Sequence, residues 1–372
     1  MIGLISLNIN TDDLNYGAIL HTWAFQQIIQ DKLGSGSNEV INYIPSHLET
    51  FNRNKPITSY IRQHDRKNTI KLILCREEYL KRLRKFERFT KEHLIVSKNQ
   101  YNEERLNETI LPYDVLICES DVIWSIAIFK GKFEETFFLA LDSMKEKKRY
   151  AYSASAANME FTKEEFDKFD ELVKNFDMIS CRESYLSDYL ENNLTIHAPH
   201  VLDPVMLVDK EKYLNLMSDR LIKEPYLLIY VPVQLNKKIY ENAKKYAREN
   251  NLKIIEVSMH PWHRFRHKVI IDAGVEEFLS LIYYADCIFT SSFHAVCFSM
   301  IFEKEFYAFS RKTGRKTEDL CKNFKVSNRY ILCDEGRNQT PIDYTEINKQ
   351  FEMRKKISME YIDTMIADFG EK

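Results

Sequence analysis

One histidine stands where the sequence could combine proton transfer with anion binding. Residues 287–290 are predicted to form a short buried strand, and a helix is predicted to begin near His294. Ser291 and Ser292 lie between them and carry hydroxyls that can cap a helix. The first turn of such a helix presents N–H groups and a positive dipole end to an anion. His294 could donate or accept a proton near neutral pH, although a packing or capping role stays open.

An arginine follows a second predicted strand, at residues 178–181. Arg182 stands where a helix is predicted to begin, and the positive end of a helix dipole disfavours a cation there. Two interpretations remain open. The guanidinium forms an ion pair with Glu183 or Asp188, or its planar fork holds a carboxylate or phosphate.

Further polar residues lie just after predicted strands, where open α/β sheets bind ligands. They could hold hydroxyls or charges of a ligand, or they could cap loops and helices. For the two cations at the end of the set, the alternative is a solvated loop. The candidates are Asn15, Tyr16, Gly17, Ser120, Asp121, Arg315 and Lys316.

The elements that must position these residues alternate between strands and helices. Short apolar runs predict strands, and segments with helical spacing predict helices between them. This alternation predicts an α/β protein with two Rossmann-like lobes facing a cleft. The first loop has no G-x-G-x-x-G pattern, so a dinucleotide fingerprint is absent. Strands are expected near residues 2–8, 39–43, 113–118, 148–155, 178–181, 200–202, 225–231, 252–258, 286–290, 306–309 and 330–333.

The lobes are expected at residues 1–203 and 204–345, followed by a terminal helix at 346–372 that can pack back on the N-terminal lobe. A helical, charged insertion is expected at about 46–110 within the first lobe. Basic and acidic residues interleave there, which is typical of a solvated helix face. A surface that faces a membrane, at residues 62–92, is the alternative.

Composition narrows the class of protein. The 372 residues are 44% hydrophobic and 29% charged, which indicates a globular chain of about two domains. A net charge of −2 provides no basic field for nucleic acid. Seven scattered cysteines without a C-x-x-C pair favour a reduced, cytoplasmic compartment and give no zinc motif. No membrane span and no signal peptide are expected, and neither is a metal ion.

Four stretches stand out in order along the chain, at residues 15–20, 113–124, 201–204 and 285–295. Together they resemble the polysaccharide pyruvyl transferase family, the fourth most specifically, and Arg182 falls where that family carries an arginine after a strand. The sequence departs from the family at Glu119 and Ala295, where glycine is usual, at Val122, often glutamine, and at Ser291, usually aspartate. A carboxylate at Glu119 would change the charge at the mouth of the cleft.

The resemblance implies a glycosyltransferase-B-like fold and a reaction. A pyruvyl group would pass from phosphoenolpyruvate, a co-substrate rather than a cofactor, to two sugar hydroxyls and form a cyclic ketal. The sugar would belong to a capsule, an exopolysaccharide or a cell-wall glycan. His294 is then expected to move protons and Arg182 to grip the donor. The donor's carboxylate or phosphate would lie at the helix start formed by Ser291, Ser292, Phe293, His294 and Ala295.

The acceptor would be a sugar or a lipid-linked oligosaccharide. Contact with the inner face of a membrane and a homo-oligomeric state both stay open. Two other functions fit the same fold: a glycosyltransferase that uses nucleotide sugars, and a non-catalytic glycan-binding homologue.

Overall fold

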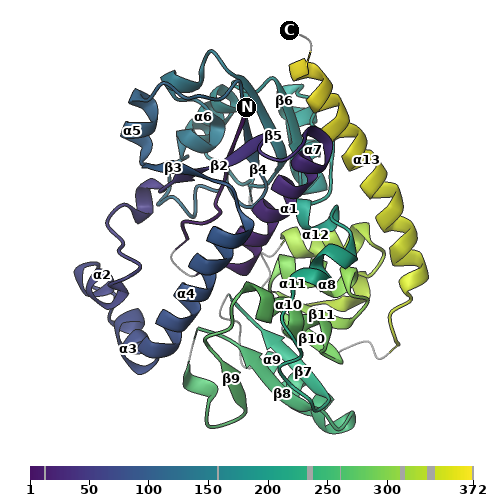
Figure 1. The fold of residues 1–372 in the computed structure, drawn as a ribbon. Helices are drawn as coiled ribbons and strands as arrows, with labels where there is room; N and C mark the ends of the chain where they lie inside the picture. The colour runs from purple at the N-terminus through teal and green to yellow at the C-terminus, as the bar shows by residue number, and fades with distance from the viewer. Residues whose placement is uncertain are drawn as a thin grey trace. The chain divides into compact units, whose positions relative to one another are not determined.

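The computed structural model has two six-stranded sheets, and every strand pair in them is parallel (Figure 1). The predicted class, α/β with two Rossmann-like lobes, is confirmed. Contacts divide the chain into unit 1 (Met1–Thr50, Thr90–Val208, Glu352–Lys372) and unit 2 (Phe51–Phe89, Asp209–Phe351). The structure describes residues 1–11, 14–156, 159–232, 238–259, 261–310, 315–332 and 340–370.

Unit 1 contains the first sheet. Strands β1 and β4 are buried along their whole length, as continuous apolar strands are when helices cover both faces. The strand order reverses between these two strands, which makes that point the switch point of the sheet. Across the sheet the strands are β3 (Val96–Tyr101), β2 (Asn38–Tyr43), β1 (Ile2–Ile5), β4 (Val115–Glu119), β5 (Lys148–Ala154) and β6 (Met178–Cys181).

Unit 2 repeats the arrangement with the second sheet. Its order, counted from its first strand β7, is again 3-2-1-4-5-6, and the switch point lies between β7 and β10. Across the sheet the strands are β12 (Tyr330–Leu332), β11 (Glu305–Ser310), β10 (Cys287–Thr290), β7 (Tyr226–Tyr230), β8 (Lys253–Val257) and β9 (Lys268–Ile270).

The helices connect the strands. The α-helices α1 to α13 are Tyr16–Leu33, Pro56–Arg62, Arg66–Leu74, Arg76–His93, Glu103–Glu108, Lys163–Val173, Ser184–Leu194, Lys210–Leu216, Lys238–Glu249, Val275–Tyr283, Phe293–Ile301, Arg315–Asn323 and Tyr344–Gly370. Short 3₁₀ helices occupy Ser46–Leu48, Glu135–Phe138, Asp142–Met144, Pro204–Met206, Pro261–His263 and Ser327–Arg329.

The C-terminal helix α13 is one long helix (yellow in Figure 1), and its last part belongs to unit 1. Its Ile362 and Met365 are fully buried. The Ser358 hydroxyl accepts a hydrogen bond from the Leu202 amide at 2.8 Å, and Asp368 pairs with Lys148 at 3.0 Å. The terminal helix therefore packs on the N-terminal sheet unit, as the sequence predicted.

Helices α2 to α4 come from a segment that lies between two strands of unit 1 in sequence, yet residues 51–89 group with unit 2. Lys85 of α4 donates to both carboxylate oxygens of Glu277 at 2.7–2.8 Å. Glu78 accepts from Arg264 at 2.7 Å. These ion pairs attach α4 to the second sheet unit, while the domain boundaries expected at residues 203 and 345 stay predictions.

The state of the cysteines and the hydropathy of the helices can be compared with what the sequence predicted. The six cysteines among the described residues are all buried and form no disulfide, while Cys333 lies outside the described part. Within the described residues, no helix combines the length and the apolar composition needed to cross a bilayer.

Candidate functional site

Several of the predicted site residues lie at the switch points of the two sheets, whereas Arg182 follows the edge strand β6, and Arg315 and Lys316 follow β11. In an open parallel sheet, ligands bind outside the carboxyl ends of the strands at such a point. Ser120 and Asp121 directly follow β4 in unit 1, and His294 follows β10 in unit 2. β4 and β10 are each the fourth strand of a sheet with the order 3-2-1-4-5-6, so the residues that follow them occupy equivalent positions in the two sheets.

The backbone turns sharply after β4. Ser120 and Asp121 both have positive φ, at 47° and 55°, although neither is glycine. Backbone of this kind costs energy and persists only where the surroundings hold it. Ser6, beyond the end of β1, donates to the Ser120 carbonyl at 3.2 Å, and the Ser120 hydroxyl donates to Asp203 at 2.7 Å. The switch point of unit 1 is thus a strained, fully hydrogen-bonded turn.

Arg182 lies at the centre of a buried cluster of carboxylates. Its Nε donates to Glu183 Oε1 at 3.0 Å, and its Nη1 donates to Asp203 Oδ2 at 3.2 Å. Asp121 Oδ1 is 3.7 Å from the same Nη1. Burial opposes the charge, but the three carboxylates outweigh it and raise the pKa of Arg182. The ion pair with Glu183 is therefore present, and the guanidinium also ties Asp203 and Asp121 to the end of β6.

Further hydrogen bonds hold the Glu183 side chain and the Arg182 backbone of this cluster in place. Ser155, after β5, donates to Glu183 at 2.8 Å. Arg354 of α13 donates to His200 Nδ1 at 3.2 Å, so His200 can donate through Nε2 to the Arg182 carbonyl at 3.0 Å. The sequence analysis assigned no role to His200 or Asp203. Asp203 did lie in a family-like stretch, which was the available signal.

Glu119 is fully buried and does not change the charge at an opening, contrary to the expectation. Its Oε2 is 2.7 Å from His21 Nδ1, and its Oε1 accepts from Thr22 at 2.7 Å. His21 Nε2 lies 3.3 Å from the Leu7 carbonyl, so a protonated ring can donate at both nitrogens. Burial alone would lower the pKa of His21, but the charge and hydrogen bond of Glu119 raise it to about 9. His21 gave no signal in the sequence, because it is one of several polar residues in helix α1 and its partner lies 98 residues away.

The first-loop candidates mainly build the start of α1. The Asn15 side chain accepts from the Gly17 amide at 2.9 Å and from the Ala18 amide at 3.3 Å, which caps the helix. Tyr16 is fully buried and Gly17 is buried too. Capping, left open by the sequence, is present, and sugar binding by these three residues stays a prediction.

The turn after β10 begins the buried helix α11, as predicted. Ser292 caps α11 by accepting from the Ala295 amide at 3.3 Å. Thr290 accepts from the Ser292 amide at 3.0 Å and donates to the Tyr230 carbonyl of β7 at 2.6 Å, which fixes the turn to the switch point. The Ser291 hydroxyl oxygen is buried and has no hydrogen-bond partner within the described part of the chain.

His294 is the second residue of this capped helix and is 7% exposed. The Phe293 ring meets its imidazole edge to face, with 5.4 Å between ring centroids. Arg315, exposed, and Lys316, half-buried, begin α12 after the neighbouring strand β11. Thr313 and Gly314 of that stretch lie outside the described residues. His294 thus has an aromatic neighbour and the amino terminus of its own helix around it.

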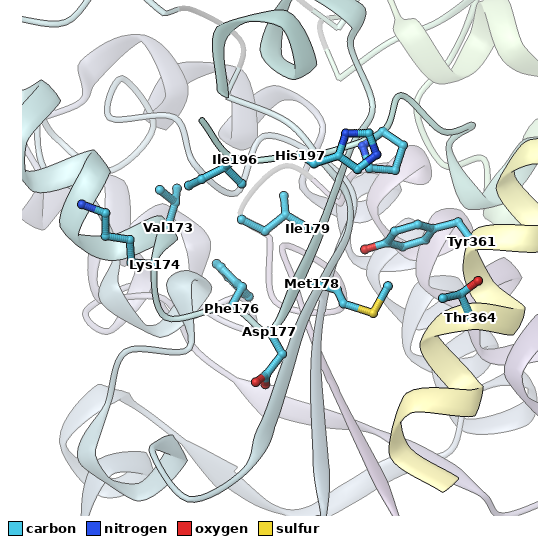
Figure 2. A pocket seen from close by; sticks show the side chains of 11 residues that line it. Val173, Lys174, Phe176, Asp177, Met178, Ile179, Ile196, His197, Tyr361 and Thr364 are labelled. Carbon is cyan, nitrogen blue, oxygen red and sulfur yellow. The ribbon is translucent and has the colours of Figure 1, made fainter. Parts of the chain in front are cut away.

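The predicted residues form two groups, one in each unit. Unit 1 also has a cavity of about 590 Å³ that none of them lines. Figure 2 shows the side chains around it. Met178 and Ile179, at the beginning of β6, line it together with Tyr361 and Thr364 of α13. Arg182 follows the other end of β6, so the cavity lies at the amino edge of the sheet, opposite the edge that binds ligands in this class of fold.

A family model for polysaccharide pyruvyl transferases matches residues 15–313. The chain belongs to this family. The match includes the β4 turn, Arg182 and the β10–α11 turn, whereas Arg315 and Lys316 lie just beyond it. No curated protein sequence matches the chain.

Solved structures of two other proteins are similar to this chain to different degrees. UDP-GlcNAc 2-epimerase from Methanocaldococcus jannaschii matches at 13% identity and a TM-score of 0.52, over 95% of this chain and 93% of that one. E. coli heptosyltransferase WaaC, solved with ADP-2-deoxy-2-fluoro heptose, matches at 8% identity and a TM-score of 0.41, over 95% and 99%. The epimerase match shows the glycosyltransferase-B-like fold of this pyruvyl transferase family member and nothing about its substrate.

Proposed function

We propose that this pyruvyl transferase family member moves the pyruvyl group of phosphoenolpyruvate onto two hydroxyls of a glycan and forms a cyclic ketal. The observation that carries the proposal is His294 in the capped first turn of α11, at the switch point of unit 2. That position combines an imidazole with the positive end of a helix, which suits an anionic donor that must be protonated.

The first addition needs one proton donor and one proton acceptor. A sugar hydroxyl oxygen attacks C2 of the donor, the methylene C3 takes a proton, and the hydroxyl loses one. Phosphate then leaves C2 with its bridging oxygen, the second hydroxyl attacks the same carbon, and its proton goes to the departing phosphate. The products are the ketal and one phosphate. His294 supplies or removes a proton in the first addition, a role worth about 10²–10⁴-fold in rate.

The donor's anionic groups are proposed to lie at the start of α11. The amides of the first helical turn and the buried Ser291 hydroxyl provide hydrogen-bond donors there. Arg315 and Lys316, after the adjacent strand, add positive charge. Binding of phosphoenolpyruvate by Arg182 stays a prediction. The guanidinium already pairs with Glu183 and Asp203, so it must leave one of these carboxylates before it can bind the donor.

Unit 1 is proposed to hold the acceptor hydroxyls through Asp121. This carboxylate is 6% exposed and lies 3.7 Å from Arg182 on a strained turn, which fixes its direction. Ser120 is proposed to act through that turn, because its hydroxyl already donates to Asp203. Arg182 then acts as a positioning residue for Asp121 as well as a candidate donor ligand.

The acceptor is further proposed to be presented at an anionic membrane surface. Residues 51–76, here called the basic helical surface, carry seven basic side chains and one acidic side chain. Four large apolar side chains of this surface are 53–59% exposed, whereas those of α4 are mostly buried. Exposed apolar groups among positive charges favour binding to anionic lipid headgroups. The exposed side chains are Ile61, Ile70, Ile73 and Leu74.

The deciding experiment incubates the protein with phosphoenolpyruvate and a panel of glycans. Released phosphate and the gain of a pyruvyl ketal on the glycan, seen by mass spectrometry, are expected together in equal amounts. His294→Ala should lose both, while His197→Ala, a matched variant at a side chain that is 87% exposed, should keep both. Stabilisation by nucleotide sugars alone would instead indicate a glycosyltransferase. Glycan binding without phosphate release would indicate a non-catalytic homologue.

A further inference from the structure

Two histidines and a glutamate of unit 2 converge on one point. Glu256, near the end of β8, is 2% exposed. Its Oε2 lies 2.9 Å from His263 Nδ1 and 2.6 Å from His267 Nε2. One atom of each of the three side chains lies within 4.8 Å of the other two. The histidines come from the connection between β8 and β9, so two separate segments contribute to the cluster.

The surroundings orient the carboxylate. Tyr240 of α9 donates to the other carboxylate oxygen, Oε1, at 3.1 Å. Its ring also packs against His263, with 4.4 Å between centroids. Metal-binding carboxylates commonly accept such a hydrogen bond from a residue outside the site, and the Tyr240 ring also limits the movement of the His263 ring.

We propose that Glu256, His263 and His267 bind one divalent transition-metal ion of the Zn²⁺ type. Two imidazole nitrogens and one carboxylate oxygen suit zinc and its neighbours, whereas Ca²⁺ and Mg²⁺ prefer oxygen ligands alone. The proposal is independent of pyruvyl transfer. The sequence has no cysteine motif for zinc, and its two histidines four residues apart, His263 and His267, meet their third partner only in the fold.

The geometry requires only a small adjustment. In a tetrahedral zinc site with bonds of about 2.0–2.1 Å, neighbouring ligand atoms lie roughly 3.4 Å apart. The observed 2.6 and 2.9 Å are hydrogen-bond lengths, so the ion takes the place of the bridging protons and the imidazoles move outward. The His263 side chain is 23% exposed, which gives the ion a path from solvent. Three protein ligands leave a fourth position for water.

The site lies at the carboxyl edge of the second sheet. Glu256 pairs in register with Ile229 of β7, one residue before the pairing of Val257 with Tyr230, and Tyr230 in turn pairs with Thr290 of β10. The ion would therefore fasten the connection between β8 and β9 to the edge of the sheet from which the β10–α11 turn also projects.

The test uses the full-length, tag-free protein, stripped with a chelator and titrated with Zn²⁺ by calorimetry and with Co²⁺ by visible absorption. We expect one equivalent per chain and a Co²⁺ spectrum of a four-coordinate nitrogen and oxygen site. Glu256→Gln and His263→Ala should each weaken binding at least about 10²-fold, and Tyr240→Phe about 10-fold at unchanged stoichiometry.

Matched controls separate this site from the rest of the chain. His197→Ala, at an exposed histidine, should bind like the wild type. Circular dichroism checks that each variant is folded, and His263→Ala, at a partly exposed side chain, serves if Glu256→Gln does not fold. Equal Zn²⁺ binding by the wild type and His263→Ala, a thiolate charge-transfer band with Co²⁺, or no binding to the wild type would each overturn the proposal.

Discussion

The buried pair of His21 and Glu119 makes a definite prediction about stability and pH. The His21 pKa is raised from 6.5 to about 9, chiefly by Glu119 against the opposing effect of burial. A raised pKa means that the folded protein binds the proton more tightly than the unfolded chain does. The stabilisation is therefore complete below about pH 6.5 and is lost as the pH rises through about 9. At about 1.36 kcal/mol per pKa unit, it amounts to roughly 3 kcal/mol.

The perturbation is Glu119→Gln, which keeps the shape of the side chain and removes its charge. We expect the variant to be less stable than the wild type by about 3 kcal/mol at pH 6.5, and this difference to disappear or change sign above pH 10, where the wild type holds the buried Glu119 carboxylate beside an uncharged imidazole. Urea unfolding at a series of pH values measures this difference. Trp262→Phe should be present in every protein, because Trp23 and Trp124 then report unit 1 alone.

A second comparison tests whether the pair acts as a pair. Replacing both His21 and Glu119 with leucine should cost much less than the sum of the two single replacements, because a well-packed apolar pair often matches a buried ion pair. Parallel pH profiles of the wild type and Glu119→Gln would refute the assigned charge of His21. If the changes in the free energy of unfolding of the two single variants added up to that of the double variant, the coupling between His21 and Glu119 would be refuted.

Three further predictions concern the proposed function. His294→Ala should lower kcat by about 10²–10⁴-fold at unchanged melting temperature, measured by phosphate release, and an unaffected rate would remove its proton-transfer role. Arg182→Ala should lower product formation at least about 10²-fold, and it should lower the free energy of unfolding by about 3–5 kcal/mol because Glu183 and Asp203 stay buried without their partner. Product assays and calorimetry measure these two effects, and a variant as stable as the wild type would contradict the proposed cluster. The double variant Ile70→Ser, Ile73→Ser should co-sediment with anionic vesicles several-fold less than the wild type, at an unchanged melting temperature. Equal vesicle binding by the wild type and the double variant, or no binding by either, would exclude a membrane contact through these side chains.

The turn that holds His294 could be predicted because its signals are local. An apolar run, two serines and an apolar helix follow one another within about a dozen residues, and the structure has the strand, the cap and the helix at those positions. The same holds for Ser120 and Asp121 at the end of β4, whose apolar run is unambiguous.

The partners of these residues could not be predicted, because they come from distant parts of the chain. Asp203 reaches Arg182 only because the β6 connection folds back, and His21 meets Glu119 across 98 residues of sequence. Neither contact has a periodic signal. Strands β3 and β9 were missed for another reason: each lies at one edge of its sheet, and β3 is largely polar while β9 has only three residues, so apolar alternation is weak.

The buried thiols make this chain its own reporter of local opening. Cys118 is the penultimate residue of β4, directly before Glu119, and Cys181 is the last residue of β6, directly before Arg182; burial raises the pKa of both thiols. Alkylation therefore has to wait until a strand end separates from its neighbours. Pulsed labelling with mass spectrometry would follow the breathing of the residues next to the switch point, peptide by peptide, without any engineered probe.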